Sequence, residues 1–305
     1  MQLPLILKTC IWGLKNNMGI ENQPESVPQK IELGPKTIDR TPPEAGGTTI
    51  IMQRHGNYDR ETGRLSIDGQ KDSLEHSKEL LSEMLEKIPP EERQKVTIFV
   101  VASPTKKNEG ERSIETAKAV IESAQSIFDS FGIPRENILT DQPMRVEDIE
   151  EPRIFKGDNK FRKFLVERYG LGSKDFWKAF EEDEHKKERE EMGSEGPAEI
   201  ADRFARFANV LARFARLFHS KNKKEGKRLI IWNVSHYDTI SPFTKNYVAG
   251  RPLEEHIPVG YDGGISLLIS PENEASITIN GESYPIELPE SGTALPRKNT
   301  KSPEK

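Results

Sequence analysis

The stretch "TTIIMQRHGNYD" (residues 48–59) decides the fold class, because it runs from a β-branched apolar segment straight into two cationic side chains. Residues 48–53 have the composition of a buried strand. Arg54 and His55 follow directly, and Gly56 comes after them. Placing such a pair at the end of a buried strand is costly unless the side chains are solvated or paired. Either the pair faces solvent by chance, or an anion binds there.

Strands alternate with helices along the rest of the sequence. Three apolar runs have the character of buried strands: 48–53, 96–103 and 228–235. Four segments have helical periodicity or composition: 66–88, 110–131, 198–220 and 238–250. A closing hairpin is expected over 263–270 and 275–281. This alternation predicts an α/β fold, a three-layer α/β/α sandwich with a mostly parallel central sheet.

The composition excludes several classes of protein. The chain has 305 residues, of which 34% are hydrophobic and 31% charged, and its formal net charge is −5. General nucleic-acid and membrane binders normally carry a basic excess, so neither partner is expected. The one cysteine, Cys10, excludes an internal disulfide framework and a multi-cysteine zinc site. The opening segment lacks the basic start and the cleavage site of a signal peptide, so a cytoplasmic protein is expected.

Composition also suggests the domain limits. Residues 1–47 are rich in proline, glycine and polar groups and are expected to be a flexible leader, and residues 288–305 a flexible tail. One compact domain is expected over 48–287. Its insertion at 159–196 includes a run of charged residues, and we expect it to cover the site and set selectivity. Four histidines outside the strand ends lack the spacing of metal ligands, so no metal and no cofactor is expected: His76, His185, His219 and His256.

Two histidines, His55 and His236, come directly after predicted buried strands. In open α/β sheets, ligands bind outside the carboxyl ends of the strands. A third strand ends at Ser103, and Arg112 begins the helix that follows. If the three strand ends lie at one edge, two arginines and two histidines converge, and phosphate is the anion that guanidinium forks match best. For either histidine alone, a hydrogen bond that caps the strand is an equally good interpretation.

The order of these motifs resembles the histidine phosphatase superfamily, in the branch that carries Arg-His-Gly and has the phosphoglycerate-mutase-like fold. Four elements carry the resemblance: Arg54-His55-Gly56; "LSIDGQ" (65–70); Ser103-Pro104 followed by Arg112 and Thr116-Ala117; and "VSHYDT" (234–239). Two features depart from the family pattern. The insertion "TKKNEGE" (105–111) precedes Arg112, and its Lys106 and Lys107 are expected to add charge at the rim. The segment between Gly56 and Leu65 is too short for the long loop of the mutases.

The resemblance implies a metal-independent phosphomonoester hydrolase that works through a phosphohistidine on His55. Arg54, Arg112 and His236 would hold the phosphate oxygens. A carboxylic acid must protonate the leaving oxygen, and Glu147 matches the family pattern best, with Glu150 and Glu151 as open alternatives.

Further contacts follow more loosely from the resemblance. Asn57, Tyr58 and Ser103 are possible substrate contacts, although Ser103 equally suits a capping role, and Asp238 is expected to be structural. The substrate is expected to be a small phosphorylated compound or a phosphoprotein. A phosphoglycerate-type mutase and a non-catalytic phosphate-binding module remain the alternative functions.

Overall fold

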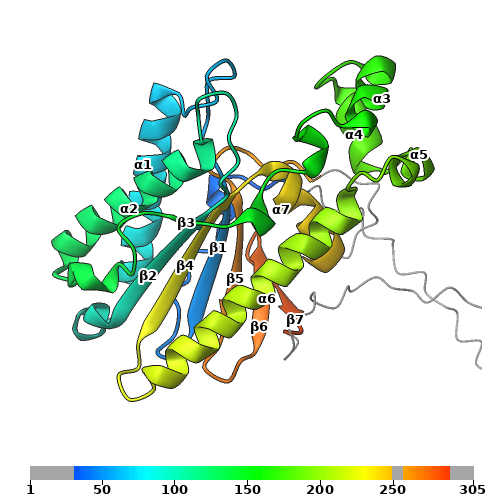
Figure 1. Cartoon of the computed structure of the whole chain (residues 1–305). Coiled ribbons are helices and arrows are strands. Elements are labelled where there is room, and N and C mark those ends of the chain that lie inside the picture. Colours follow the sequence, from blue (N-terminus) through cyan, green and yellow to red (C-terminus); the bar gives the residue numbers. More distant parts are fainter. Residues whose placement is uncertain (1–30, 249–256, 289–305) are drawn as a thin grey trace, which may run out of the picture. The chain divides into compact units, whose positions relative to one another are not determined.

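The structure is a computed structural model that describes residues 31–248 and 257–288. Its centre is a seven-stranded mixed sheet in the order β3-β2-β4-β1-β5-β6-β7 (Figure 1). The strands have these bounds: β1 Thr48–Arg54, β2 Val96–Ala102, β3 Met144–Arg145, β4 Arg228–Ser235, β5 Gly264–Ile269, β6 Ala275–Ile279 and β7 Glu282–Ile286. Strands β1 to β4 pair in parallel, and β5, β6 and β7 add antiparallel ladders. The predicted hairpin is β5–β6.

The register of the parallel strands brings three strand ends level. Strand β4 lies between β1 and β2. Arg54 at the end of β1 is opposite Ser235 of β4, and Ala102 at the end of β2 is opposite Val234. The residues that follow β1, β2 and β4 therefore leave the sheet at the same edge.

Helices cover both faces of the sheet, as Figure 1 shows. Ile98 and Val100 of β2 belong to the apolar core that includes α1 (Ile67–Glu86) and α2 (Arg112–Phe131). Phe99 points to the opposite face, because side chains alternate along a strand. There its ring lies 5.2 Å from that of Phe214 on α6 (Pro197–Lys221). The expected three-layer α/β/α sandwich with a parallel core is confirmed.

The insertion forms a small apolar core of its own. It contains the helices α3 (Lys160–Tyr169), α4 (Lys174–Glu181) and α5 (Lys186–Glu191). Buried side chains hold it together, among them Phe161, Leu165, Phe176 and Phe180, and Ile200 of α6 joins them. The last helix, α7 (Tyr237–Phe243), continues as a π-helical turn over Thr244–Val248. Short 3₁₀ turns complete the described elements: Pro35–Thr37, Pro90–Lys95, Arg135–Asn137, Glu147–Ile149 and Arg153–Phe155.

The expected leader is too long at its carboxyl end. Leu33 is fully buried, and its backbone N–H donates to the carbonyl of Pro258 at 2.8 Å. Ile38 joins the main apolar core. A segment rich in proline and glycine therefore packs as part of the fold, because a few apolar side chains anchor it. Residues 1–30 of the leader, residues 289–305 of the tail and the end of the predicted helix 238–250 lie outside the described residues. Among the described helices, none combines the length and the apolar character needed to cross a membrane.

Candidate active site

Four predicted site residues meet at the carboxyl edge of the sheet. Arg54 ends β1 and His55 follows it, His236 follows β4, and Arg112 begins α2. The ring centroids of His55 and His236 are 5.2 Å apart. Arg112 bridges them: its Nε is 2.9 Å from His55 Nε2 and its Nη2 is 3.4 Å from His236 Nδ1. The predicted convergence of three strand ends is therefore present in the structure.

The hydrogen bonds of His55 define its tautomer. Its Nδ1 lies 2.8 Å from the carbonyl oxygen of Gly56, which can only accept, so Nδ1 carries the proton. Nε2 then presents a lone pair, which accepts from the Nε–H of Arg112. His55 is thus held as a neutral imidazole with its basic nitrogen directed at the arginine.

His236 is fixed in the same way. Its Nδ1 faces the Arg112 guanidinium, which can only donate. Its Nε2 therefore carries the proton and donates to Ser103 Oγ at 2.9 Å. Ser103 also bonds Thr105 Oγ1 at 2.8 Å. Ser103, a predicted substrate contact, is buried and orients His236 in this structure, and it is not part of the cavity wall described below.

Both histidines are held neutral by their surroundings. Burial, followed by the nearby charges of Arg112 and Arg54, lowers the pKa of His55 well below its usual range. Burial and then Arg112 do the same for the pKa of His236. A neutral imidazole at physiological pH is the nucleophilic form.

The loop after His55 must approach α1 closely. A Cβ on Gly56 would lie 2.2 Å from Ser73 Oγ and 3.1 Å from the backbone oxygen of Gly69. A side chain at this position would displace the Ser73 hydroxyl group and crowd the backbone of α1, which favours glycine here. The backbone N–H of Gly56 donates to Thr116 Oγ1 at 2.9 Å, which ties the loop to α2. The Arg-His-Gly stretch is therefore explained by packing as well as by charge.

Arg54 is positioned by groups that the sequence did not reveal. Its Nη1 donates to the carbonyl of Val259 at 2.6 Å. Its guanidinium carbon lies 4.1 Å from the ring centroid of Tyr261 and 5.1 Å from that of Tyr237. Cation–π contacts of this kind orient a guanidinium without a carboxylate. Tyr261 stands in an irregular loop, where no periodic pattern marks it.

Three buried polar atoms in this cluster have no hydrogen-bond partner within the described part of the chain: Arg54 Nε, Arg112 Nη1 and Asp238 Oδ1. Buried guanidinium donors are normally satisfied. Two such donors beside two neutral histidines indicate a site for an anion.

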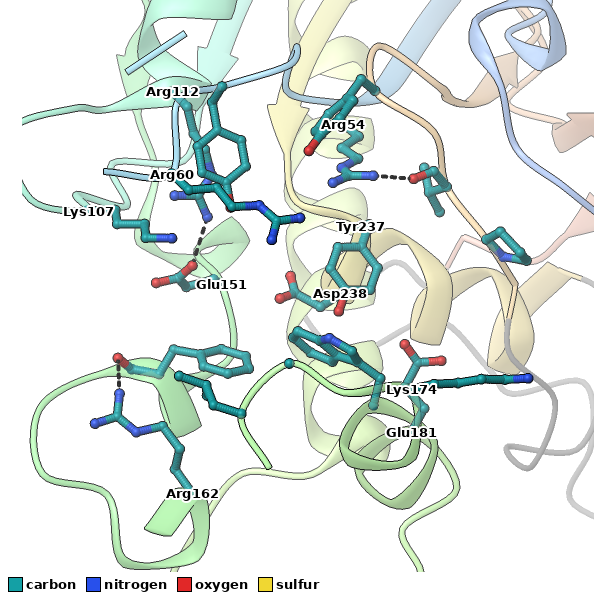
Figure 2. A pocket seen from close by; sticks show the side chains of 18 of the residues that line it. Arg54, Arg60, Lys107, Arg112, Glu151, Arg162, Lys174, Glu181, Tyr237 and Asp238 are labelled. Atoms are coloured by element: carbon teal, nitrogen blue, oxygen red, sulfur yellow. Dashed lines mark hydrogen bonds and ion pairs between the residues drawn. The ribbon is translucent and has the colours of Figure 1, made fainter. Parts of the chain in front are cut away.

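A cavity of about 1150 Å³ opens above the cluster, and Figure 2 shows its wall. Arg54, Arg112 and Tyr58 line it, whereas neither imidazole does. His55 is covered by groups that do line it: Arg112 bonds its Nε2, and the ring of Tyr58 lies 5.3 Å from its own. A ligand in the cavity must therefore draw Arg112 aside to reach His55. Tyr58, one of the predicted substrate contacts, is in position to touch such a ligand.

The insertion supplies one wall of the cavity. Arg162, Lys174 and Trp177 line it, and the ring of Trp177 lies 5.2 Å from that of Tyr237. The tertiary structure thus brings residues 159–196 to the site, where their influence on selectivity stays a prediction. Asn57, by contrast, is exposed and absent from the wall. Its Oδ1 accepts from the backbone N–H of Tyr58, so it stabilises the turn, and the expected substrate contact stays a prediction.

The structure does not bring Glu147 to the site. Glu147 is exposed at the start of a 3₁₀ turn and is not part of the cavity wall. Glu150 pairs with Lys156 and is also absent from the wall. Glu151 is the one of the three that lines the cavity, and its Oε2 accepts from Arg112 Nη2 at 2.9 Å. Of the three candidate acids, the structure therefore brings Glu151 to the cavity and leaves the preferred Glu147 outside it.

Asp238 is a second carboxyl group in the cavity wall, where the sequence suggested a structural role. It is buried, and Figure 2 shows it near Glu151 and Tyr237. Burial and then the negative charge of Glu151 raise the pKa of Asp238 to about 8. Asp238 is therefore protonated at neutral pH.

No group of three or more histidine, cysteine or acidic side chains within residues 31–248 and 257–288 is arranged to hold a metal ion.

Comparisons with known proteins were made on both sequence and structure. No protein-family model matches the sequence, and no curated protein matches it. Among solved structures, the chain is similar to a phosphoglycerate mutase from Bacillus anthracis, with 13% identity over 80% of this chain and 95% of that one, at a TM-score of 0.45.

Two phosphatases are also similar in structure. One is a phosphoserine phosphatase from Entamoeba histolytica in complex with 3-phosphoglyceric acid, with 14% identity over 78% of this chain and 96% of that one, at a TM-score of 0.40. The other is a mycobacterial glucosyl-3-phosphoglycerate phosphatase, with 13% identity over 76% of this chain and 97% of that one, at a TM-score of 0.39.

Proposed function

We propose that this protein is a metal-independent phosphomonoester hydrolase of the histidine phosphatase superfamily, with His55 as its nucleophile. One observation carries the proposal: two buried guanidinium donors, Arg54 Nε and Arg112 Nη1, have no partner among the described residues. They belong to the arginines beside neutral His55, whose basic nitrogen accepts from Arg112 Nε. A phosphate ester supplies acceptor oxygens for both donors. Its phosphorus atom is then the electrophile nearest to the histidine.

Phosphate binding also releases the nucleophile. In the structure, the Nε–H of Arg112 occupies the lone pair of His55 Nε2. A phosphate dianion competes for this arginine, because a charge-assisted bidentate pair is stronger than a bond to a neutral imidazole. Once Arg112 turns to the phosphate oxygens, the lone pair of His55 faces phosphorus. His236 then donates to a phosphate oxygen or stays on Ser103.

The reaction proceeds in two displacements. When the phosphate displaces Glu151 from Arg112, the freed carboxylate takes up a proton from solvent. His55 Nε2 then bonds to phosphorus while the bond from phosphorus to the ester oxygen breaks, and Glu151 donates that proton to the leaving oxygen. Water then attacks the phosphohistidine, Glu151 takes a proton from that water, and the N–P bond breaks. Inorganic phosphate leaves and His55 regains its lone pair. The guanidinium groups of Arg54 and Arg112 carry the negative charge throughout.

The role of Glu151 predicts a dependence on the leaving group. Glu151→Gln cannot donate or accept the proton, so hydrolysis of alkyl phosphates should fall about 10²- to 10⁴-fold. Hydrolysis of p-nitrophenyl phosphate should fall much less in the first step, because p-nitrophenolate leaves without a proton. The measurement is kcat/KM for both substrates, with Glu147→Gln as the matched control. An equal loss on both substrates would reassign the acid.

The raised pKa of Asp238 predicts how kcat/KM changes at alkaline pH. Its carboxyl group is neutral below its pKa of about 8 and ionised above it. Ionisation places a negative charge in the cavity, which repels a phosphate dianion. We therefore expect kcat/KM to fall as the pH rises through about 8, and Asp238→Asn to remove this fall. If Asp238→Asn is instead inactive at every pH on alkyl phosphates while Glu151→Gln is not, Asp238 is the proton donor.

The function itself is tested by phosphate release with EDTA present. The wild-type protein should hydrolyse p-nitrophenyl phosphate and some members of a panel of phosphomonoesters, with release of inorganic phosphate. Isomerisation of a phosphoglycerate without net release would make the protein a mutase. Tight binding of phosphate with no turnover on any ester would make it a binding module.

A further inference from the structure

The 105–111 insertion, directly before α2, is joined to the loop after β1 by backbone hydrogen bonds. The backbone N–H groups of Glu109 and Gly110, within the insertion at 105–111, both donate to the carbonyl of Thr62, at 3.1 and 2.9 Å. A Cβ on Gly110 would lie 2.1 Å from the carbonyl carbon of Gly63, so only glycine allows this approach. The two loops therefore form one platform, held by the backbone and not by long side chains.

The platform presents cations to the cavity. Arg60, Lys106 and Lys107 all line it. Figure 2 shows Arg60 and Lys107 directed into the cavity on the same side as Arg112. Within the described residues, none of the three platform cations lies in an ion pair, and Lys107 Nζ is 5.2 Å from the ring centroid of Tyr58.

The two glutamates of the 105–111 insertion form ion pairs outside the cavity. Glu109 pairs with Arg64 at 3.9 Å, and Glu111 pairs with Arg145 at 2.6 Å. Neither glutamate lines the cavity. Asp59 and Glu61, on the loop after β1, do not line the cavity either. Within the described residues, the platform therefore presents three cations and no carboxylate to the cavity, and the carboxyl groups that line it stand on other elements: Glu151, Glu181, Glu182 and Asp238. Such a field favours an anionic ligand.

The first phosphate group does not use these cations in the proposed reaction. It is held by Arg54 and Arg112, at the ends of β1 and the start of α2. The cavity, at about 1150 Å³, is larger than the ~300–1,000 Å³ of ordinary small-molecule pockets. There is room for a substrate that reaches from the histidines to the platform.

We propose that Arg60, Lys106 and Lys107 form a second anion subsite, and that the preferred substrates are small phosphomonoesters bearing a further anionic group. A second phosphate suits three cations best, and a carboxylate is the smaller alternative of the same chemistry. The subsite deepens the proposed function and rests on it, because it selects among esters that the same histidine would hydrolyse. The 105–111 insertion, which interrupts the family pattern before Arg112, then selects substrates that carry a second anionic group.

Matched pairs of substrates test the subsite. The compounds are the bisphosphates of α,ω-alkanediols with two to six carbons and the monophosphates of the same diols, so the leaving oxygens are alike and the flexible chain spans different distances. A bisphosphate has two equivalent ends, which alone doubles its kcat/KM. We expect at least one bisphosphate to exceed its monophosphate about tenfold or more, as several partly exposed ion pairs together supply. The ω-phosphoalkanoates of the same lengths report whether a carboxylate suffices.

The charge of the platform is then removed. The triple variant Arg60→Gln/Lys106→Gln/Lys107→Gln should bring the ratio of bisphosphate to monophosphate back to about two, mainly through KM. The control is Lys71→Gln/Lys118→Gln/Arg206→Gln, which removes the same charge at exposed positions outside the cavity wall and should keep the high ratio. A Lys106→Gln/Lys107→Gln double variant, with an intermediate ratio, separates loss of charge from a damaged loop.

Binding separates the two proposals. In the His55→Ala variant, calorimetry measures the Kd of bisphosphate and monophosphate without turnover. If esters are hydrolysed but the ratio stays near two in the wild type, the subsite is overturned and the phosphatase stands. If nothing is hydrolysed but bisphosphates bind about tenfold tighter and the triple variant loses this, the subsite stands and the phosphatase is overturned. Equal binding together with no hydrolysis overturns both.

Discussion

Replacing His55 with alanine should reduce phosphate release from p-nitrophenyl phosphate by at least about 10⁴-fold. The proposed reaction has no other route to the covalent intermediate, and removal of a nucleophile costs on this order in enzymes that depend on one. The loss should appear in kcat, because the guanidinium groups of Arg54 and Arg112 remain to bind the ester. The measurement is steady-state release of nitrophenol and phosphate at pH 7 with EDTA present.

The covalent intermediate provides the second readout. Rapid quenching of the wild-type protein with radiolabelled ester should trap label on the protein in a form that is stable in alkali and lost in acid, as expected for phosphohistidine. His55→Ala should trap none. His219→Ala is the matched control. His219, on α6, has its Nε2 2.8 Å from Thr48 Oγ1 on β1 and does not line the cavity. Its replacement should leave turnover and trapping near wild type. Normal turnover by His55→Ala would remove the nucleophile from this account.

Replacing Arg112 with lysine should cost about 10²- to 10³-fold in kcat/KM, the usual effect of losing a preorganised donor to the transition-state oxygens. Lysine keeps the charge but has one nitrogen, so it cannot contact His55, His236 and Glu151 together. The Kd for inorganic phosphate should weaken in parallel. Kinetics and phosphate titration of the same preparation give both values.

Arg145→Lys is the control for this change. Arg145 is half-exposed and pairs with Glu111, directly before α2, and it does not line the cavity. It should keep the wild-type kcat/KM, since its ion pair is outside the site. Equal losses of kcat/KM in both variants would mean that α2 has shifted. An unchanged kcat/KM in Arg112→Lys would show that the guanidinium group of Arg112 is not needed.

The convergence of the site could be predicted from the sequence because its signals are local. The buried strands β1, β2 and β4 are read from short apolar runs, and Arg54 and His236 stand at or directly after the ends of two of them. Parallel neighbours in a sheet end at one edge, so naming the strands was enough to bring their terminal side chains together. The tertiary structure adds one condition that the sequence did not predict: β4 lies between β1 and β2.

The choice among the glutamates could not be made in this way. Glu147, Glu150 and Glu151 stand within one irregular segment, where no period assigns a direction to each side chain. Arg203 of α6, far along the chain, bonds the carbonyls of Glu147, Asp148 and Glu150 at 2.8–3.3 Å and sets the path of this segment. A long-range contact thus turns Glu151 into the cavity and leaves Glu147 outside.

The local sequence pattern therefore predicts the strands, the helices and the strand-end cluster, since each depends on residues close together in the chain. The rest depends on packing between distant segments: Tyr261 against Arg54, the insertion against α7, and the burial that raises the pKa of Asp238 to about 8. These features arise from desolvation and from contacts that form only when the chain folds. Neither can be predicted from the residues that flank the position in the sequence.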